Sequence, residues 1–132
     1  MDFVADNSVI VGWFSRSQAT GYTDRMFARL RSAHVYVPAV WPMEFTNALV
    51  LLERRRSLRR DEVSQICDKA AQLIADIESP PAVPRLLVLA RQYSLTAYDA
   101  AYLELALRLS LPLASKNGAL AVAARKTGLF AT

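Results

Sequence analysis

The chain contains 132 residues, of which 53% are hydrophobic and 21% are charged, and its formal net charge is +4. This length fits one ordinary domain with a core of its own, and the composition excludes a disordered chain. The modest positive charge suits an acidic partner such as RNA without requiring one. The single cysteine, Cys67, and the single histidine, His34, exclude an internal disulfide, a Cys-rich zinc site and any mechanism that needs two histidines.

No apolar stretch approaches the ~20 residues that cross a bilayer. The N-terminal residues also lack the basic and then apolar pattern of a secretory signal. We therefore expect one domain over residues 1–132, without membrane contact, in a reducing cytoplasmic setting.

The first part of the chain predicts two strands and two helices. The apolar run 3–5, which ends at Asp6, predicts a strand, and Ser8 is expected to cap a short helix after it. The spacing of apolar residues predicts a helix over 22–32. Residues 35–37 are β-branched or aromatic and are followed by proline, which predicts a second strand.

The middle of the chain predicts two more helices and a loop. Pro42 stands where a helix would begin, a position that proline tolerates. A further helix is expected to begin at Asp61 and to carry one apolar face as far as Ile77, with Cys67 in the core. Three prolines within 79–84 predict a loop there.

The last part of the chain predicts three helices and a third strand. The expected elements are a helix over 86–93, a helix capped by Thr96 that runs to about Ser110, a buried strand over 111–115, and a helix over 119–126 closed by Gly128. Strands and helices thus alternate along the whole chain. This order predicts an α/β three-layer sandwich, in which a central, mostly parallel sheet has helices on both faces.

Four polar residues are predicted at one edge of this sheet, where the carboxyl ends of the strands form the ligand crevice. Asp6 ends the first strand, Glu44 lies early in the helix after the second, Asp99 lies early in the helix that Thr96 caps, and Asn117 follows the third strand. Two carboxylates ~4 Å apart repel by about 4 kcal/mol at an effective dielectric of ~20. An all-oxygen cluster therefore favours protonation or a hard cation, Mg²⁺ or Mn²⁺, and a hydrated ion of this kind suits phosphodiester hydrolysis.

Taken singly, each of these residues also has a purely structural interpretation. Asp6 suits the cap of the following turn, and Glu44 near a helix start favours the helix dipole. Asp99 stands three residues after Thr96, which matches a capping box, and Asn117 suits the N-cap of the last helix. Only their joint placement favours the functional interpretation.

Four motifs follow one another along the chain. They are Phe3-Val4-Ala5-Asp6-Asn7-Ser8-Val9, Pro38-x-x-Trp41-x-x-Glu44-x-x-Asn47, Leu95-Thr96-Ala97-Tyr98-Asp99-Ala100-Ala101-Tyr102-Leu103 and Leu111-Pro112-Leu113-Ala114-Ser115-x-Asn117. In this order, and over nearly the whole chain, they resemble the PIN-domain ribonucleases, specifically the VapC-type toxins of prokaryotic VapBC toxin–antitoxin pairs. The block from Tyr98 to Tyr102 is the most specific part.

The resemblance implies a PIN-like fold and a Mg²⁺- or Mn²⁺-dependent endoribonuclease, the toxin of a type II toxin–antitoxin system. It implies that Asp6, Glu44 and Asp99 are the metal-binding and catalytic acids. The supporting residues that it implies are Ser8, Asn47 and Ser115. It further implies a homodimer and inhibition by a cognate VapB-like antitoxin, whose tail enters a groove beside the acids.

The family's fourth acid usually follows the last buried strand in a Thr-x-Asp pattern, and this chain has Ser115-Lys116-Asn117 there. Asparagine keeps an oxygen acceptor but removes one negative charge, which lowers metal affinity and removes a general base. The alternative function is therefore a catalytically weakened PIN-like module that binds RNA or the antitoxin without cleaving.

The chain also carries a strongly basic segment. Five arginines fall within seven residues: Arg54, Arg55, Arg56, Arg59 and Arg60. Arginine binds phosphate through bidentate contacts, and a basic patch speeds the encounter with RNA. These arginines, together with Lys116, are predicted to contact RNA or the antitoxin. The other interpretation is a solvated helix end and a plain surface lysine.

Overall fold

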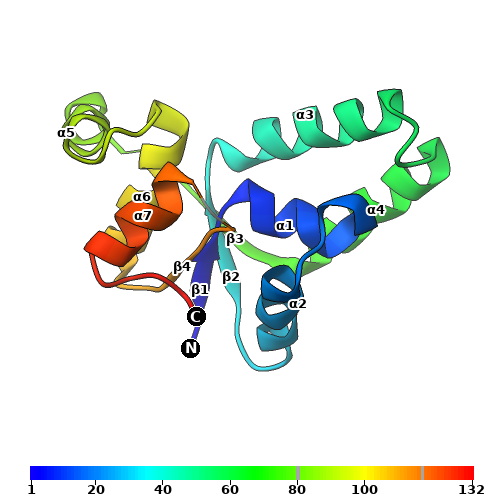
Figure 1. The fold of residues 1–132 in the computed structure, drawn as a ribbon, viewed down its shortest axis with the longest axis horizontal. Coiled ribbons are helices and arrows are strands. Elements are labelled where there is room, and N and C mark those ends of the chain that lie inside the picture. The colour runs from blue at the N-terminus through cyan, green and yellow to red at the C-terminus, as the bar shows by residue number, and fades with distance from the viewer. Residues whose placement is uncertain (80, 117) are drawn as a thin grey trace.

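The structure is a computed structural model that describes residues 1–79, 81–116 and 118–132. Its sheet has four parallel strands in the order β3-β2-β1-β4: β1 (Phe3–Ala5), β2 (Val35–Pro38), β3 (Ile74–Glu78) and β4 (Leu113–Ala114). Figure 1 shows helices α1 (Asn7–Phe14), α2 (Gly21–Ala28), α3 (Trp41–Arg54) and α4 (Arg60–Leu73) on one side of it, and α5 (Val83–Tyr93), α6 (Ala97–Leu109) and α7 (Ala119–Lys126) on the other. The predicted α/β sandwich with a parallel sheet is confirmed.

The core lies around β1 and α6. Phe3, Val4 and Ala5 have no exposed surface, as expected of a central parallel strand covered on both faces. Every residue of α6 from Ala100 to Ala106 is buried, because this helix packs on β1 and β2 and against α5 and α7. In the described part of the chain, no helix has the length and hydropathy that crossing a bilayer requires.

A fourth strand replaces the end of a predicted helix. The helix expected to continue to Ile77 ends at Leu73, and Ile74–Glu78 form β3, which pairs in parallel with β2. Two isoleucines three residues apart match helical spacing, but pairing with β2 overrides this local pattern. Ile77 is 48% exposed, which is consistent with the edge position of β3.

Two further expectations for this region are corrected. Cys67 was expected in the core but is exposed, because its side of α4 faces an open groove instead of the sheet. The predicted loop over 79–84 is shorter than expected, since α5 begins at Val83 and takes Pro84 into its first turn. Pro80, which also falls in this segment, lies outside the described residues.

The capping residues follow the sequence signals at α6 and α7 but not at α1. Asp6, not Ser8, caps α1, because its carboxylate accepts the backbone N–H of Val9. Thr96 caps α6 as predicted, and its hydroxyl accepts the N–H of Asp99. Gly128 adopts a φ of 75° after α7, a left-handed conformation that favours glycine.

The contact between α1 and α2 depends on the absence of a side chain at Gly12. A Cβ there would lie 2.7 Å from Thr23 Cγ2. Thr23 cannot yield, since its side chain is fully buried and held in a reciprocal capping box with Thr20. We expect Gly12→Ala to lower the free energy of unfolding by about 1–3 kcal/mol, as overpacked cores do.

Gly21→Ala is the matched control, because a Cβ at that position meets only the flexible end of Arg25 at 3.7 Å. It should leave stability unchanged or raise it by up to ~1 kcal/mol. Denaturant unfolding followed by circular dichroism measures both. Equal midpoints for Gly12→Ala and the unmodified protein would contradict the packing argument.

Candidate active site

Asp6 lies at the carboxyl end of the central strand and is hydrogen-bonded on both oxygens. Its Oδ1 accepts the Ser8 hydroxyl at 2.6 Å and the Val9 N–H at 3.1 Å, while its Oδ2 accepts the Ser115 hydroxyl at 2.6 Å. The register places Ser115 there, because Ala5 pairs with Ala114 and the next residues of the two strands are neighbours. Burial raises the pKa of Asp6 in spite of these three donors, which act to lower it.

Glu44 lies in the first turn of α3, which follows β2, and is tied to two other helices. Its Oε1 accepts the hydroxyl of Tyr102 on α6 at 2.7 Å. Its backbone oxygen accepts the Asn7 side-chain amide on α1 at 3.3 Å. Burial is the main cause that raises the pKa of Glu44; the Tyr102 hydroxyl lowers it, and the negative charges of Asp99 and Asp6 raise it further.

Asp99 lies in the first turn of α6 and is half-buried. Its backbone N–H donates to the hydroxyl of Thr96, so the main chain of Asp99 takes part in capping the helix, as the sequence predicts. In the part of the chain that the structure describes, its carboxylate has no hydrogen bond. Burial raises the pKa of Asp99, and the charge of Asp6 raises it further.

These three acids form one electrostatic unit, since the charge of Asp6 raises the pKa of both Glu44 and Asp99, and the charge of Asp99 raises that of Glu44. Within the described ranges, none of them has a Lys, Arg or His partner; the ion pairs there involve other acids. The unit thus has an excess of negative charge and only oxygen donors, which is the chemistry of a site for Mg²⁺ or Mn²⁺. The buried Asn7 Oδ1, which has no hydrogen-bond partner there, adds one more oxygen acceptor beside Asp6.

The side chains are not drawn together into a closed chelate. Over residues 1–79, 81–116 and 118–132, no three His, Cys, Asp or Glu side chains gather closely enough to hold a metal among themselves. Mg²⁺ keeps several waters and is typically bound by one or two carboxylates and a substrate phosphate, so it does not require three protein carboxylates. Joint binding of one ion by all three acids stays a prediction.

The remaining predicted site residues lie in several different parts of the fold. Asn47 is exposed on α3, one turn after Glu44, and Lys116 donates to the backbone oxygen of Gln18 at 2.7 Å. Asn117 lies outside the described residues. The structure places the arginines at the opposite end of α3 and in the turn to α4: Arg54, Arg55, Arg56, Arg59 and Arg60. They are all exposed.

Sequence reasoning missed two residues that hold the acids, Asn7 and Tyr102. Tyr102 stands three residues after Asp99, so helical spacing places both on the same face of α6. That spacing was a usable signal, because a buried tyrosine hydroxyl needs a partner. Asn7 gave no comparable signal, since an asparagine at a helix start is common at the surface and its contact with Glu44 is visible only in the folded chain.

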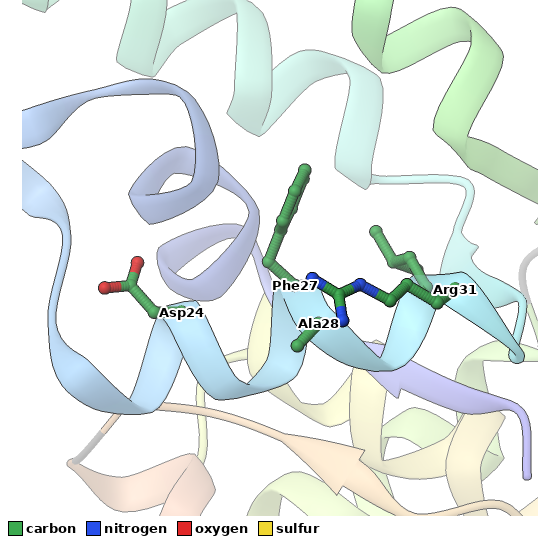
Figure 2. A pocket seen from close by; sticks show the side chains of 5 residues that line it. Asp24, Phe27, Ala28 and Arg31 are labelled. Carbon is green, nitrogen blue, oxygen red and sulfur yellow. The ribbon is translucent and has the colours of Figure 1, made fainter.

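Two open hollows are lined by none of the three acids. The hollow in Figure 2, of about 470 Å³, is lined by side chains from α2 and the 3₁₀ turn after it: Asp24, Phe27, Ala28, Leu30 and Arg31. It holds none of the three acids and is not a candidate for the same chemistry. The second, of about 550 Å³, is an apolar groove between α3, α4 and β3. Its lining includes Trp41, Phe45, Cys67 and Ile77.

Comparison with known proteins finds a matching family model and a solved structure of similar fold. Residues 3–126 match the family model described as PIN domain. The fold is similar to the crystal structure of PAE2754 from Pyrobaculum aerophilum, with a TM-score of 0.69 and 19% sequence identity over 92% of this chain and 78% of that chain. At this identity the likeness concerns the fold alone. No curated protein gives a significant match.

The repulsion among the acids predicts how the stability of the metal-free protein depends on pH. Because the pKa of Asp99 is higher in the folded than in the unfolded chain, its ionisation destabilises the fold as pH rises through the folded value. Asp99→Asn removes that charge, so we expect a higher melting temperature than that of the unmodified protein at pH 7 in EDTA. The difference should vanish below the unfolded pKa of about 3.9, where Asp99 is protonated in both states.

Thermal melts at several pH values in EDTA measure this effect. The same melts with added Mn²⁺ are the matched comparison. A cation that binds the folded state stabilises the unmodified protein more than the variant. An Asp99→Asn variant that melts lower in EDTA at pH 7 would contradict the electrostatic argument.

Proposed function

The chain belongs to the PIN-domain family, and from that premise we propose that it is a metal-dependent endoribonuclease of the VapC type. PIN domains are typically metal-dependent nucleases, generally with Mg²⁺ or Mn²⁺. The observation that carries the proposal is the set of three mutually repelling acids without basic partners in the described structure. Such a set has a destabilising charge excess that a divalent cation would neutralise.

In this proposal Asp6, Glu44 and Asp99 hold the ion, which supplies positive charge to a phosphate oxygen and lowers the pKa of the attacking water. Ser8 and Ser115 keep Asp6 in one orientation, because each donates to a different carboxylate oxygen. A fixed carboxylate needs no reorganisation when substrate arrives.

Asp99 is the acid best suited to accept a proton. Its carboxylate is half-buried and has no hydrogen bond within the described ranges, so its oxygens are free to accept a proton from the attacking water. The water oxygen forms a bond to phosphorus as the ester bond to the leaving oxygen breaks. One water proton passes to the Asp99 carboxylate, and the leaving oxygen takes up a proton from solvent.

A catalytically weakened module that binds RNA or the antitoxin without cleaving is the second candidate. The observation that favours it is Asn117, which stands where the family usually has a fourth acid. Under this proposal the three remaining acids bind the cation weakly. The two candidates differ in whether RNA is cut at all.

The proposed partners are a VapB-like antitoxin, RNA and a second copy of the chain. The apolar groove supports the antitoxin proposal, because it begins at Trp41 and Phe45, on the helical turn that carries Glu44. An antitoxin segment lying there would approach the acids. For the homodimer, support comes from exposed apolar side chains on α5, namely Val83, Leu87 and Val88.

The arginines support binding of RNA at a distance from the acids. Arg54 stands ten residues after Glu44 on α3, which corresponds to about 15 Å along a helix. Arg56 adopts a φ of 61°, and the backbone bonds from Arg56 to Glu53 and from Ser57 to Leu52 form the helix-ending motif in which glycine is usual. An arginine with positive φ costs conformational free energy that glycine would not cost, and its presence here is consistent with a role in binding RNA.

We expect cleavage of RNA oligonucleotides in Mn²⁺ or Mg²⁺ and none in EDTA. Asp6→Asn and Asp99→Asn should each lower the rate at least ~100-fold, since each removes a charge that holds the ion. Asn117→Asp should raise the rate. Gel assays of end-labelled RNA measure all of these. Cleavage that continues in EDTA, or in both Asn variants, would contradict the proposed enzyme, and binding without cleavage in every condition would support the weakened module.

Arg56→Gly separates RNA binding from stability. We expect the variant to be more stable by about 1 kcal/mol, because glycine has no penalty at positive φ. Its affinity for single-stranded RNA should fall, and the slope of log K against log salt should decrease by about 0.7 for one lost phosphate contact.

Ser94→Gly is the matched control, since Ser94 has a φ of 54° at the end of α5, away from the arginines. It should gain stability without a change in RNA affinity. Fluorescence anisotropy at several salt concentrations measures the binding. An unchanged salt slope in Arg56→Gly would remove Arg56 from the proposed contact.

A further inference from the structure

Tyr102 links the core of the protein to the second acid of the site. Its side chain is 1% exposed, and its hydroxyl donates to Glu44 Oε1 at 2.7 Å. Burial raises the pKa of Tyr102 far above its usual range, and the Glu44 carboxylate raises it further, so the phenol keeps its proton and remains a donor. A hydrogen bond from a neutral donor to a carboxylate is stronger than one between neutral groups.

Glu44 is held at two points by the elements that carry the other acids. Asn7, next to Asp6, donates to the backbone oxygen of Glu44, and Tyr102, three residues after Asp99, donates to its carboxylate. The position of the second acid therefore depends on the elements that position the first and the third.

The Tyr102 contact also distinguishes the two oxygens of Glu44. Oε1 is engaged, whereas Oε2 has no hydrogen bond in the described part of the chain. Oε2 therefore keeps both of its lone pairs for a cation, whereas Oε1 has already used one and is the poorer ligand. Mg²⁺ requires a near-ideal octahedron with short bonds, whereas Ca²⁺ accepts larger coordination numbers and carboxylates that bind through both oxygens.

We propose that Tyr102 is a positioning residue that keeps Glu44 a one-oxygen ligand and thereby sets the preference of the site for Mg²⁺ or Mn²⁺ over Ca²⁺. The inference rests on the proposed function, because it requires a cation at Glu44. It goes beyond that function in assigning ion selectivity to a buried hydroxyl that touches neither ion nor substrate.

The test is Tyr102→Phe in the full chain, which keeps the buried ring and removes only the hydroxyl. Calorimetric titration with Mn²⁺ and, separately, with Ca²⁺ measures the two affinities. We expect Mn²⁺ binding to weaken about 10-fold, as is typical when a group that orients a metal ligand is lost. Ca²⁺ binding should change less, so the ratio of the two affinities falls. A purely structural defect would weaken both ions equally.

The RNA cleavage assay provides an independent readout. In Tyr102→Phe the Mn²⁺ concentration for half-maximal rate should rise by the same factor as the dissociation constant. The kcat at saturating Mn²⁺ and the KM for RNA should stay close to those of the unmodified protein. A kcat that does not recover at saturating Mn²⁺ would contradict a role through Glu44.

Two comparisons isolate the contact. Tyr93→Phe is the control, since its hydroxyl accepts the Gln92 side-chain amide at 3.4 Å and does not contact an acid in the described residues; it should leave the affinity ratio unchanged. Tyr102→Phe should have no further effect on Mn²⁺ affinity in a Glu44→Ala background, and its full effect in an Asp99→Asn background. Equal effects in both backgrounds would overturn the inference.

The outcomes separate this inference from the proposed function. If the unmodified protein binds Mn²⁺ and cleaves RNA while Tyr102→Phe keeps the same affinity ratio, the positioning role is wrong and the nuclease stands. If the unmodified protein neither binds Mn²⁺ nor cleaves, the nuclease proposal fails first. If Tyr102→Phe does not fold, Glu44→Asp replaces it as the test variant, because the shorter aspartate side chain withdraws from the Tyr102 hydroxyl. An unchanged ratio of Mn²⁺ to Ca²⁺ affinity in Glu44→Asp would overturn the inference.

Discussion

Electrostatic repulsion among Asp6, Glu44 and Asp99 is the constraint on which the site depends. The fold brings these acids to the carboxyl edge of a parallel sheet, buries them in part and provides no basic partner in the described residues. Folding therefore costs more with the acids ionised than with the acids neutral. A core as continuous as the one around β1 and α6 is what allows the chain to carry that cost.

The groups that surround the acids offset part of this cost and also fix their geometry. Asp6 accepts three hydrogen bonds, one of them the cap of α1, so a structural role and a chemical role coincide in one side chain. Glu44 is held by Tyr102 and Asn7 from two different helices. The same contacts that stabilise the anions prevent them from moving apart, and this favours a preformed site.

Glu44 lies in the first turn of α3, and the basic segment begins at the other end of that helix with Arg54. This separation prevents the arginines from neutralising the acids, which would remove the charge that attracts a cation. It also leaves four exposed guanidinium groups without an ion pair in the described residues, those of Arg54, Arg55, Arg56 and Arg60, whereas Arg59 pairs with Asp61 at 3.1 Å. Helix α3 thus separates the negative charge of Glu44 from the positive charges of the basic segment and holds them at a fixed distance.

Local sequence patterns alone determined on which strand end or helix each acid lies. An apolar run that ends at Asp6, a proline that begins the helix of Glu44 and the Thr96 cap before Asp99 are each read within a few residues. Tertiary structure decided the rest: that Ile74–Glu78 pair with β2 as a strand, that Cys67 faces an open groove, and that Tyr102 meets Glu44 across 58 residues. Periodicity records which face of an element is apolar, whereas strand pairing and side-chain contacts depend on which elements become neighbours, and only the folded chain settles that.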